Sequence, residues 1–415
     1  MTRKIIFSLS IFILILLSAT AILSQRFQQV EPAQVGMSAA RLEQVTPVIQ
    51  AAIASQDIPG AVLLVARHGK VVLRRAYGDA QLVPEKVLMS PAAIFDMASV
   101  TKPVATATSV MVLLEQGKLR LQDKVKNFVP GFNRFRFPNG EFAEDASIVH
   151  LLTHTSGLPP YFSADSLKRV YGYPCPIDSM AAFIGRLAKS NAPGEEFHYS
   201  CLNFITLAKI VKDVSGLNIH QFSQKYVFAP LRMEHTGYIP QVGEMTPDPN
   251  SPLIKLANDL IAPTEVINGI PLHGTVHDPL ARLLGGISGN AGLFSNVDDL
   301  FVYAQMLLNG GKYGGVRVLS PLTVQKMTML YPVTKTAGRA LGWDVSSDYS
   351  SNGGDLFPTP GFGHTGYTGT SIWVNPATAT IVILLTNRVH PADDGSVTRL
   401  RGLVANIVAA AIVEK

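Results

Sequence analysis

The sequence predicts an α+β fold in which one antiparallel sheet, built from both ends of the chain and flanked by helices, adjoins a mainly helical second lobe. Apolar runs separated by short turns occur near both ends of the chain and are typical of β-hairpins. Segments with apolar residues at helical spacing fill the middle. Helices on a sheet bury its apolar faces, and a cleft between two lobes is a common binding site.

The N-terminal elements predict a helix followed by a hairpin. Ser38 is a candidate N-cap for a helix whose apolar residues run from Leu42 to Ile53. Residues 61–66 and 71–76 are apolar-rich and flank a turn at 68–70, as expected for two paired strands.

The C-terminal residues also predict a hairpin and a helix. A hairpin is expected from residues 371–374 and 380–386, and an amphipathic helix from about 397 to 413 closes the chain. The clearest helices between the two ends are predicted at 101–114, 180–187, 204–214 and 300–308. Two stretches rich in Pro and Gly, 130–145 and 238–279, are expected to be loops, and the second is long enough to form a wall of a site.

The first residues resemble a targeting segment, which sets the expected domain limits. Arg3 and Lys4 precede an apolar run, and residues 19–21 have the small-x-small form of a cleavage site. We expect a signal peptide or anchor over 1–24, an α/β lobe of 30–95 plus 335–415, and a mainly helical lobe over 96–334 with long loops. The protein would be exported, to the periplasm or the extracellular space; if the leader is retained, residues 5–23 would attach it to a membrane.

Composition narrows the class of partner. The 415 residues carry a formal net charge of +5, and 47% of them are hydrophobic, which suits a large globular protein. A positive net charge this small, without a run of basic residues, does not indicate nucleic-acid binding. The two cysteines, Cys175 and Cys201, could pair in an oxidising compartment or remain free thiols.

The strongest chemical signal is Ser99-Val100-Thr101-Lys102 at the start of a predicted helix. A three-residue step places Ser99 and Lys102 on one face, about 5–6 Å apart at Cβ. A lysine whose pKa is lowered by burial can take the proton of a serine and make it a nucleophile. Helix N-termini also present free N–H groups to developing negative charge. The motif alone is also compatible with an N-cap serine and a solvated lysine.

Two further segments add to this signal. Tyr199 lies in Phe197-His198-Tyr199-Ser200-Cys201, and a phenol near an ammonium can act as general base and acid. Residues 363–370 hold three glycines beside a predicted strand, which suggests close approach of the backbone to a ligand. Taken singly, Tyr199 is better explained as an ordinary aromatic residue at a helix start, and residues 363–370 are also compatible with a simple turn.

Parts of the sequence are compatible with two other site chemistries, a zinc site and a thiol nucleophile. His150 and His154 have the i, i+4 spacing of zinc ligands, but Leu151 stands where a zincin has glutamate, so structural histidines are favoured. Cys201 with His198 as a thiol dyad rests on nearness in sequence alone. We therefore expect no metal and no organic cofactor.

Together, the order Ser-x-x-Lys, Tyr-Ser-x, His-Thr-Gly resembles the serine β-lactamase-related family, which includes class C β-lactamases, DD-peptidases, D-aminopeptidases and esterases. The similarity runs from about Gly36 to the C-terminus. Supporting segments are Ile58-Pro59-Gly60-Ala61, residues 150–159, Val276-His277-Asp278 and Ala291-Gly292-Leu293-Phe294-Ser295. The resemblance implies a β-lactamase/transpeptidase-like fold.

The resemblance also implies roles. Ser99 would be the acylated nucleophile, Lys102 would help to deprotonate it, and Tyr199 would transfer protons to the leaving group and from the deacylating water. The backbone N–H groups of Ser99 and Tyr367 would form the oxyanion hole.

Substrate binding would fall to His364, Thr365, Gly366 and Cys201, two of which depart from the family pattern. Cys201 stands where the family often has Asn or Asp, so recognition of amide groups is weakened. His364 replaces the lysine of β-lactamases, and histidine is only partly charged near pH 7.

These departures favour an esterase or peptidase, acting on a small-molecule or peptidoglycan-like acyl substrate, over a true β-lactamase. The alternatives are a class C-like β-lactamase, and a penicillin-binding sensor or pseudoenzyme that is acylated without turnover.

Overall fold

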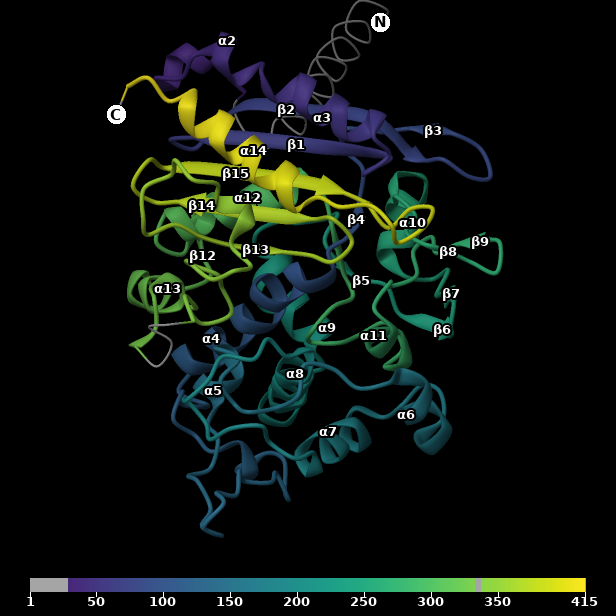
Figure 1. The fold of residues 1–415 in the computed structure, drawn as a ribbon, viewed down its shortest axis with the longest axis vertical. Coiled ribbons are helices and arrows are strands. Elements are labelled where there is room, and N and C mark those ends of the chain that lie inside the picture. Colours follow the sequence, from purple (N-terminus) through teal and green to yellow (C-terminus); the bar gives the residue numbers. More distant parts are fainter. Residues whose placement is uncertain (1–28, 333–336, 415) are drawn as a thin grey trace, which may run out of the picture.

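The computed structural model describes residues 29–332 and 337–414, and a six-stranded antiparallel sheet forms its upper part in the view of Figure 1. The strand order across the sheet is β13 (Phe362–Thr365), β14 (Ser371–Asn375), β15 (Thr380–Thr386), β1 (Gly60–Arg67), β2 (Lys70–Gln81) and β3 (Val87–Leu88). Strands from the two ends of the chain meet at β1 and β15, where Ala61 pairs with Thr386 and Arg67 with Thr380. The predicted hairpins and the sheet built from both chain ends are confirmed.

Alternate residues of the central strands enter two different cores. Leu63 and Val65 of β1 pack with the helices α2 (Ala39–Leu42), α3 (Val45–Ala54) and α14 (Thr398–Ala410). Val62 and Leu64 face the larger core, which holds α12 (Val297–Leu308). This period-two alternation is what a sheet buried on both faces requires. Ser38 caps α2 by accepting a hydrogen bond from Arg41 N, as predicted.

The remaining chain is mainly helical and extends away from the sheet (Figure 1). Its α-helices are α4 (Thr108–Glu115), α5 (Ile148–Leu152), α6 (Ala164–Tyr171), α7 (Ile177–Arg186), α8 (Cys201–Ser215), α9 (Ile219–Ser223), α10 (Pro252–Ala257), α11 (Pro279–Leu283) and α13 (Pro321–Thr328). A small sheet joins β4 (Phe95–Asp96), β10 (Leu293–Ser295) and β5 (Gly237–Tyr238).

Two sequence predictions need correction in detail. The helix expected from 101 is not uniform: a short 3-10 helix, Ala98–Val100, is followed by a π-helix, Lys102–Ala107, before α4 begins. Pro103 has no N–H to donate, which is one reason for the irregular start. The segment 238–279 is also not wholly loop, since it contains α10 and the hairpins β6–β7 (Gln241–Gly243, Thr246–Pro247) and β8–β9 (Val266–Ile267, Ile270–Pro271).

The predicted leader, residues 1–24, lies outside the described residues. Within the described ranges, no helix is both long and apolar enough to cross a membrane. The proposed limits of the two lobes stay a prediction.

Candidate active site

Ser99 and Lys102 lie at the junction between the sheet β4–β10–β5 and the long helical segment that ends with α4. Lys102 Nζ donates one hydrogen bond to Ser99 Oγ (2.9 Å) and another to the backbone carbonyl of Asn290 (3.0 Å). The lysine side chain has no exposed surface. The first two predicted site residues are therefore in direct contact, and Lys102 is a buried, oriented donor and not a solvated side chain.

The backbone just before Ser99 is strained. Ala98 has φ +43°, a value that residues with a Cβ rarely adopt. Asp96, which is fully buried, accepts a hydrogen bond from Ala98 N (2.8 Å), and Met97 N donates to Leu293 O (2.8 Å). These contacts hold the conformation that presents the Ser99 side chain. Nothing in the local sequence indicated a role for Asp96, because its effect depends on the distant β10 and on the turn that it stabilises.

Tyr199 lies two residues before α8, within reach of Lys102. Lys102 Nζ is 5.0 Å from the centroid of the Tyr199 ring, and the two side chains share a hydrogen bond. The ring is stacked on both faces, by His154 (centroids 4.4 Å apart) and by Tyr349 (4.9 Å). The phenol is thus fixed beside the ammonium, so the structure brings the three predicted catalytic side chains into one cluster.

His154 packs against Tyr199 and also contacts the residue next to it. Its Nδ1 accepts a hydrogen bond from Ser200 N (3.0 Å), the residue next to Tyr199. Burial, and then the positive charge of Arg339, hold the pKa of His154 well below its usual value, so the ring stays neutral. His150 accepts instead from Ser147 N (3.1 Å). No group of three or more side chains that could hold a metal occurs in the described ranges.

The pKa of Lys102 is shifted in the direction opposite to the sequence-based expectation. Burial by itself lowers it. The electrostatic interactions with Cys201 and Tyr199, and the hydrogen bond with Tyr199, act in the opposite direction and outweigh burial, so the net pKa of Lys102 is raised. The prediction of a lysine poised to lose its proton was wrong, because it counted desolvation without the neighbouring acids. In this arrangement Lys102 is a cation.

A cavity of about 510 Å³ opens at Ser99 and is also lined by Tyr199, Thr365, Gly366 and Tyr367. Neither the Ser99 nor the Tyr367 backbone N–H donates a hydrogen bond to any other described residue. Two free N–H groups beside a serine hydroxyl are the geometry that a carbonyl oxygen needs when it becomes negative.

Two of the predicted substrate-binding residues lie behind the cavity surface. His364 is 1% exposed and does not line the cavity; its Nδ1 contacts the carbonyl of Thr365 (2.8 Å). Burial, followed by the charges of Arg339 and Lys102, holds the pKa of His364 well below its usual value. Cys201 contacts Lys102 through its sulfur (3.5 Å) and is unpaired with Cys175, since both are free thiols. Direct substrate contact by His364 and Cys201 stays a prediction.

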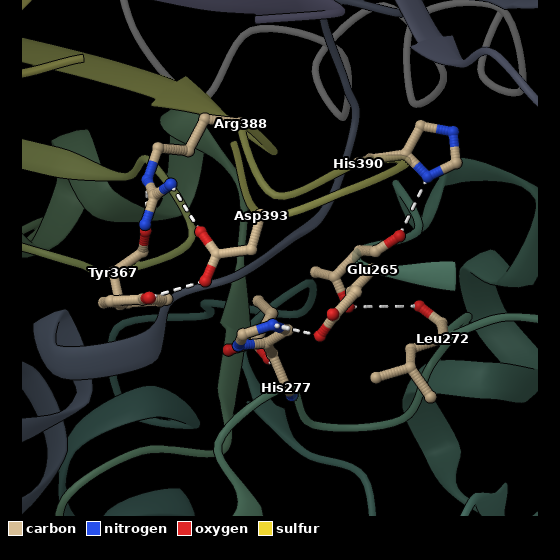
Figure 2. A network of polar contacts seen from close by, with 9 residues as sticks. Glu265, Leu272, His277, Tyr367, Arg388, His390 and Asp393 are labelled. Atoms are coloured by element: carbon tan, nitrogen blue, oxygen red, sulfur yellow. Dashed lines mark hydrogen bonds and ion pairs between the residues drawn. The ribbon is translucent and has the colours of Figure 1, made fainter. Parts of the chain in front are cut away.

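The Tyr367 side chain belongs to a polar network that the sequence did not indicate (Figure 2). Its hydroxyl donates to Asp393 Oδ2 (2.5 Å), and Arg388 binds both Asp393 Oδ1 (2.6 Å) and the backbone carbonyl of Tyr367 (2.8 Å). The His277 ring stacks on Tyr367 (centroids 5.8 Å apart) and pairs with Glu265 (3.2 Å). The segment that would supply an oxyanion-hole N–H is therefore fixed from several directions.

The fold and this site define a class: a serine hydrolase, with a lysine and a tyrosine side chain beside the candidate nucleophile Ser99. Comparison with known proteins agrees. Residues 45–406 match the family described as Beta-lactamase, and the chain belongs to that family.

Similar proteins differ in the activities that their names state. The chain is 30% identical to an N-acetylmuramyl-L-alanine amidase of Bacillus subtilis over 85% of this chain and 82% of the relative. It is also 30% identical to a protein of Salmonella schwarzengrund, provisionally named D-alanyl-D-alanine carboxypeptidase, over 90% of this chain and 89% of the relative.

Solved structures share the fold. EstCE1, described as a hydrolase with promiscuous acyltransferase activity, has a TM-score of 0.69 and 25% identity, covering 89% of this chain and 99% of its own. An octameric penicillin-binding protein homologue of Pyrococcus abyssi has a TM-score of 0.66 at 22% identity, covering 87% of this chain and 76% of its own.

Proposed function

We propose that this protein is an exported hydrolase that forms an acyl-enzyme at Ser99 and acts on an ester or amide of a peptidoglycan-like or small acyl compound. The observation that carries the proposal is the cluster of Ser99 Oγ, Lys102 Nζ and the Tyr199 phenol at one cavity. The names of the relatives, an amidase and a carboxypeptidase of cell-wall compounds, support the substrate class and an exported location.

The positive charge of Lys102 favours Tyr199 as the general base in the first step. Because Lys102 is a cation, Tyr199 is the group that accepts the Ser99 proton: its phenolate form, held beside the ammonium, takes the proton and becomes the phenol as Oγ attacks the carbonyl carbon. The carbonyl oxygen becomes negative and is stabilised by the N–H groups of Ser99 and Tyr367. Tyr199 then returns the proton to the leaving group and later takes one from the water that releases the acyl group.

The neutral state of His364 favours an esterase or peptidase over a β-lactamase. A lysine at this position would place a permanent positive charge beside the cavity, whereas His364 is buried and uncharged near pH 7. A β-lactam carboxylate would therefore lack that attraction here.

The proposal is tested with purified protein on p-nitrophenyl esters, nitrocefin and D-Ala-D-Ala peptides, with Ser99→Ala as the blank. We expect ester or peptide turnover well above nitrocefin turnover, and loss of both turnover and fluorophosphonate labelling in Ser99→Ala. Fluorophosphonate labelling that persists in Ser99→Ala would show that another residue is the nucleophile. A stoichiometric burst without steady-state turnover would instead favour a sensor.

A further inference from the structure

Arg401 of α14 is a buried cation whose contacts all lie on the turn that carries Tyr367. Its Nη2 donates to the backbone carbonyls of Gly366 (2.8 Å) and Thr370 (2.9 Å), and the residue is 8% exposed. No carboxylate among the described residues pairs with it. Burial first, and then the charge of Arg388, lower the pKa of Arg401 to about 9, so the guanidinium remains charged at neutral pH.

The carbonyl of Gly366 belongs to the same peptide unit as the N–H of Tyr367. A trans peptide unit is planar, so a contact at its oxygen also fixes the direction of its N–H. That N–H has no partner among the described residues, and Gly366, Tyr367 and Arg401 all line the cavity at Ser99. Hydrogen bonds to the carbonyl oxygen, from Arg401 and from Gly369 N (3.1 Å), thus direct the Tyr367 N–H, which stays free for a ligand.

We propose that Arg401 is a positioning residue for the oxyanion hole, which orients and polarises the Gly366–Tyr367 peptide unit through its carbonyl oxygen. A cation on the oxygen draws electron density along the C–N bond and makes the N–H a stronger donor, and linked hydrogen bonds strengthen one another in this way. The inference rests on the proposed function, because it assigns a donor to the acyl-transfer step.

Two further hydrogen bonds place this turn relative to Ser99, whereas the Gly366–Tyr367 peptide itself is contacted at its oxygen by Arg401 and by Gly369 N (3.1 Å). The hydroxyls of Thr368 and Thr370 donate to the carbonyls of Asp96 (2.7 Å) and Met97 (3.0 Å). These bonds join the turn to the segment that precedes the nucleophile, but neither touches the Gly366–Tyr367 peptide unit. Both bonds come from Nη2, whose two hydrogens lie in the guanidinium plane, so the two carbonyls are bound in a fixed geometry, whereas the donors of an ammonium rotate.

The experiment compares Arg401→Met and Arg401→Lys with a matched control, Arg399→Met, an exposed arginine on the same helix. Each protein is assayed on two esters that differ only in a carbonyl oxygen or a thiocarbonyl sulfur. The N–H donors bind an oxyanion better than a thiolate-like sulfur, so their contribution appears as the oxygen-to-sulfur preference.

We expect Arg401→Met to lower kcat on the oxygen ester by about 10- to 100-fold with little change in KM, somewhat less than loss of a direct oxyanion donor. The oxygen-to-sulfur ratio should fall with it, Arg401→Lys should recover part of both, and Arg399→Met should match the wild type. The rate of fluorophosphonate labelling at Ser99 should fall in parallel, since the phosphonyl oxygen occupies the same hole.

An unchanged oxygen-to-sulfur ratio in Arg401→Met would overturn the inference. So would a rise in KM confined to anionic esters, which would make Arg401 a substrate-binding residue. If Arg401→Met does not fold, the test is made on Arg401→Lys. An unaltered oxygen-to-sulfur ratio in Arg401→Lys, together with reduced thermal stability, would mean that Arg401 has a structural role alone. Absence of Ser99-dependent turnover in the wild type would refute the proposed function itself, which is a separate outcome.

Discussion

Ser99 and Tyr367 line the same cavity, but different forces hold the two segments. Around Ser99 the side chains are buried. Lys102 and Val104 have no exposed surface, and Val104 is part of the large apolar core. Tyr367 is 58% exposed, and its contacts are to charged groups, Arg388 and Asp393. The proposed nucleophile is thus placed by packing, which tolerates little change in volume. The proposed oxyanion donor opposite it is placed by directed hydrogen bonds, which depend on single side chains.

The largest effect should come from the buried side. Tyr199→Phe removes the hydroxyl but keeps the ring stacked between its neighbours, so folding should be retained while the proton acceptor is lost. We expect kcat to fall by about 10²- to 10⁴-fold. Steady-state kinetics on a chromogenic ester measures it, with Tyr349→Phe as the matched stacking partner that should stay near wild type. Equal losses in both variants would remove Tyr199 from the proton transfer.

The next effect tests how closely the two segments approach. A Cβ on Gly366 would lie 2.1 Å from Thr370 Oγ1 and 2.5 Å from Met97 O, so Gly366→Ala must push the turn away from the nucleophile segment. We expect a destabilisation of about 1–3 kcal/mol, as for other overpacked sites, together with a large loss of activity. Thermal unfolding and ester kinetics measure both. Gly131→Ala is a control with open space around its Cβ, although its positive φ adds some strain. Full activity in Gly366→Ala would contradict the close approach.

The smallest effect concerns stability and pH, away from the cavity. Burial, and then the charge of Lys124, lower the pKa of His150 to about 4. Below about pH 6.5 the unfolded chain binds a proton that the folded chain does not, so the free energy of unfolding decreases as the pH falls from 6.5 toward 4. At about 1.4 kcal/mol per pH unit, the loss is about 2 kcal/mol at pH 5.

His150→Gln retains a hydrogen-bond acceptor without a titrating group. The variant should be less stable than the wild type at pH 7, and the difference should narrow by about 2 kcal/mol at pH 5. Urea unfolding at the two pH values measures this, with His198→Gln, an exposed histidine, as control. A constant difference between wild type and His150→Gln would mean that His150 does not contribute to the pH dependence.

The predictable part of this molecule is the part governed by local pattern. The hairpins, the Ser38 cap and the Ser99–Lys102 step follow from periodicity and turn residues, and the structure contains each of them. The role of Asp96 was not predicted, and His154 was predicted only as a structural histidine without its partners, since both depend on contacts to residues far away in the sequence. The direction of the Lys102 pKa shift was missed for the same reason.

The sequence contains a weak indication that Arg401 is buried. It lies among the buried positions of α14, with Leu400, Val404 and Val408, so it is an arginine on an apolar face. A charged residue at such a position is rarely buried without a partner. Which partner it has could not be known, because Gly366 and Thr370 reach it only when the sheet is assembled.

The pairing of β1 with β15 has a consequence for how the chain folds. The two strands are more than 300 positions apart, so the centre of the sheet cannot form until nearly all of the chain is available. Until then β1 presents an apolar strand edge with no neighbour on that side, a surface prone to association with other chains. We therefore expect slow folding, and C-terminal truncations that remove β15 and α14 should aggregate rather than yield a smaller native form.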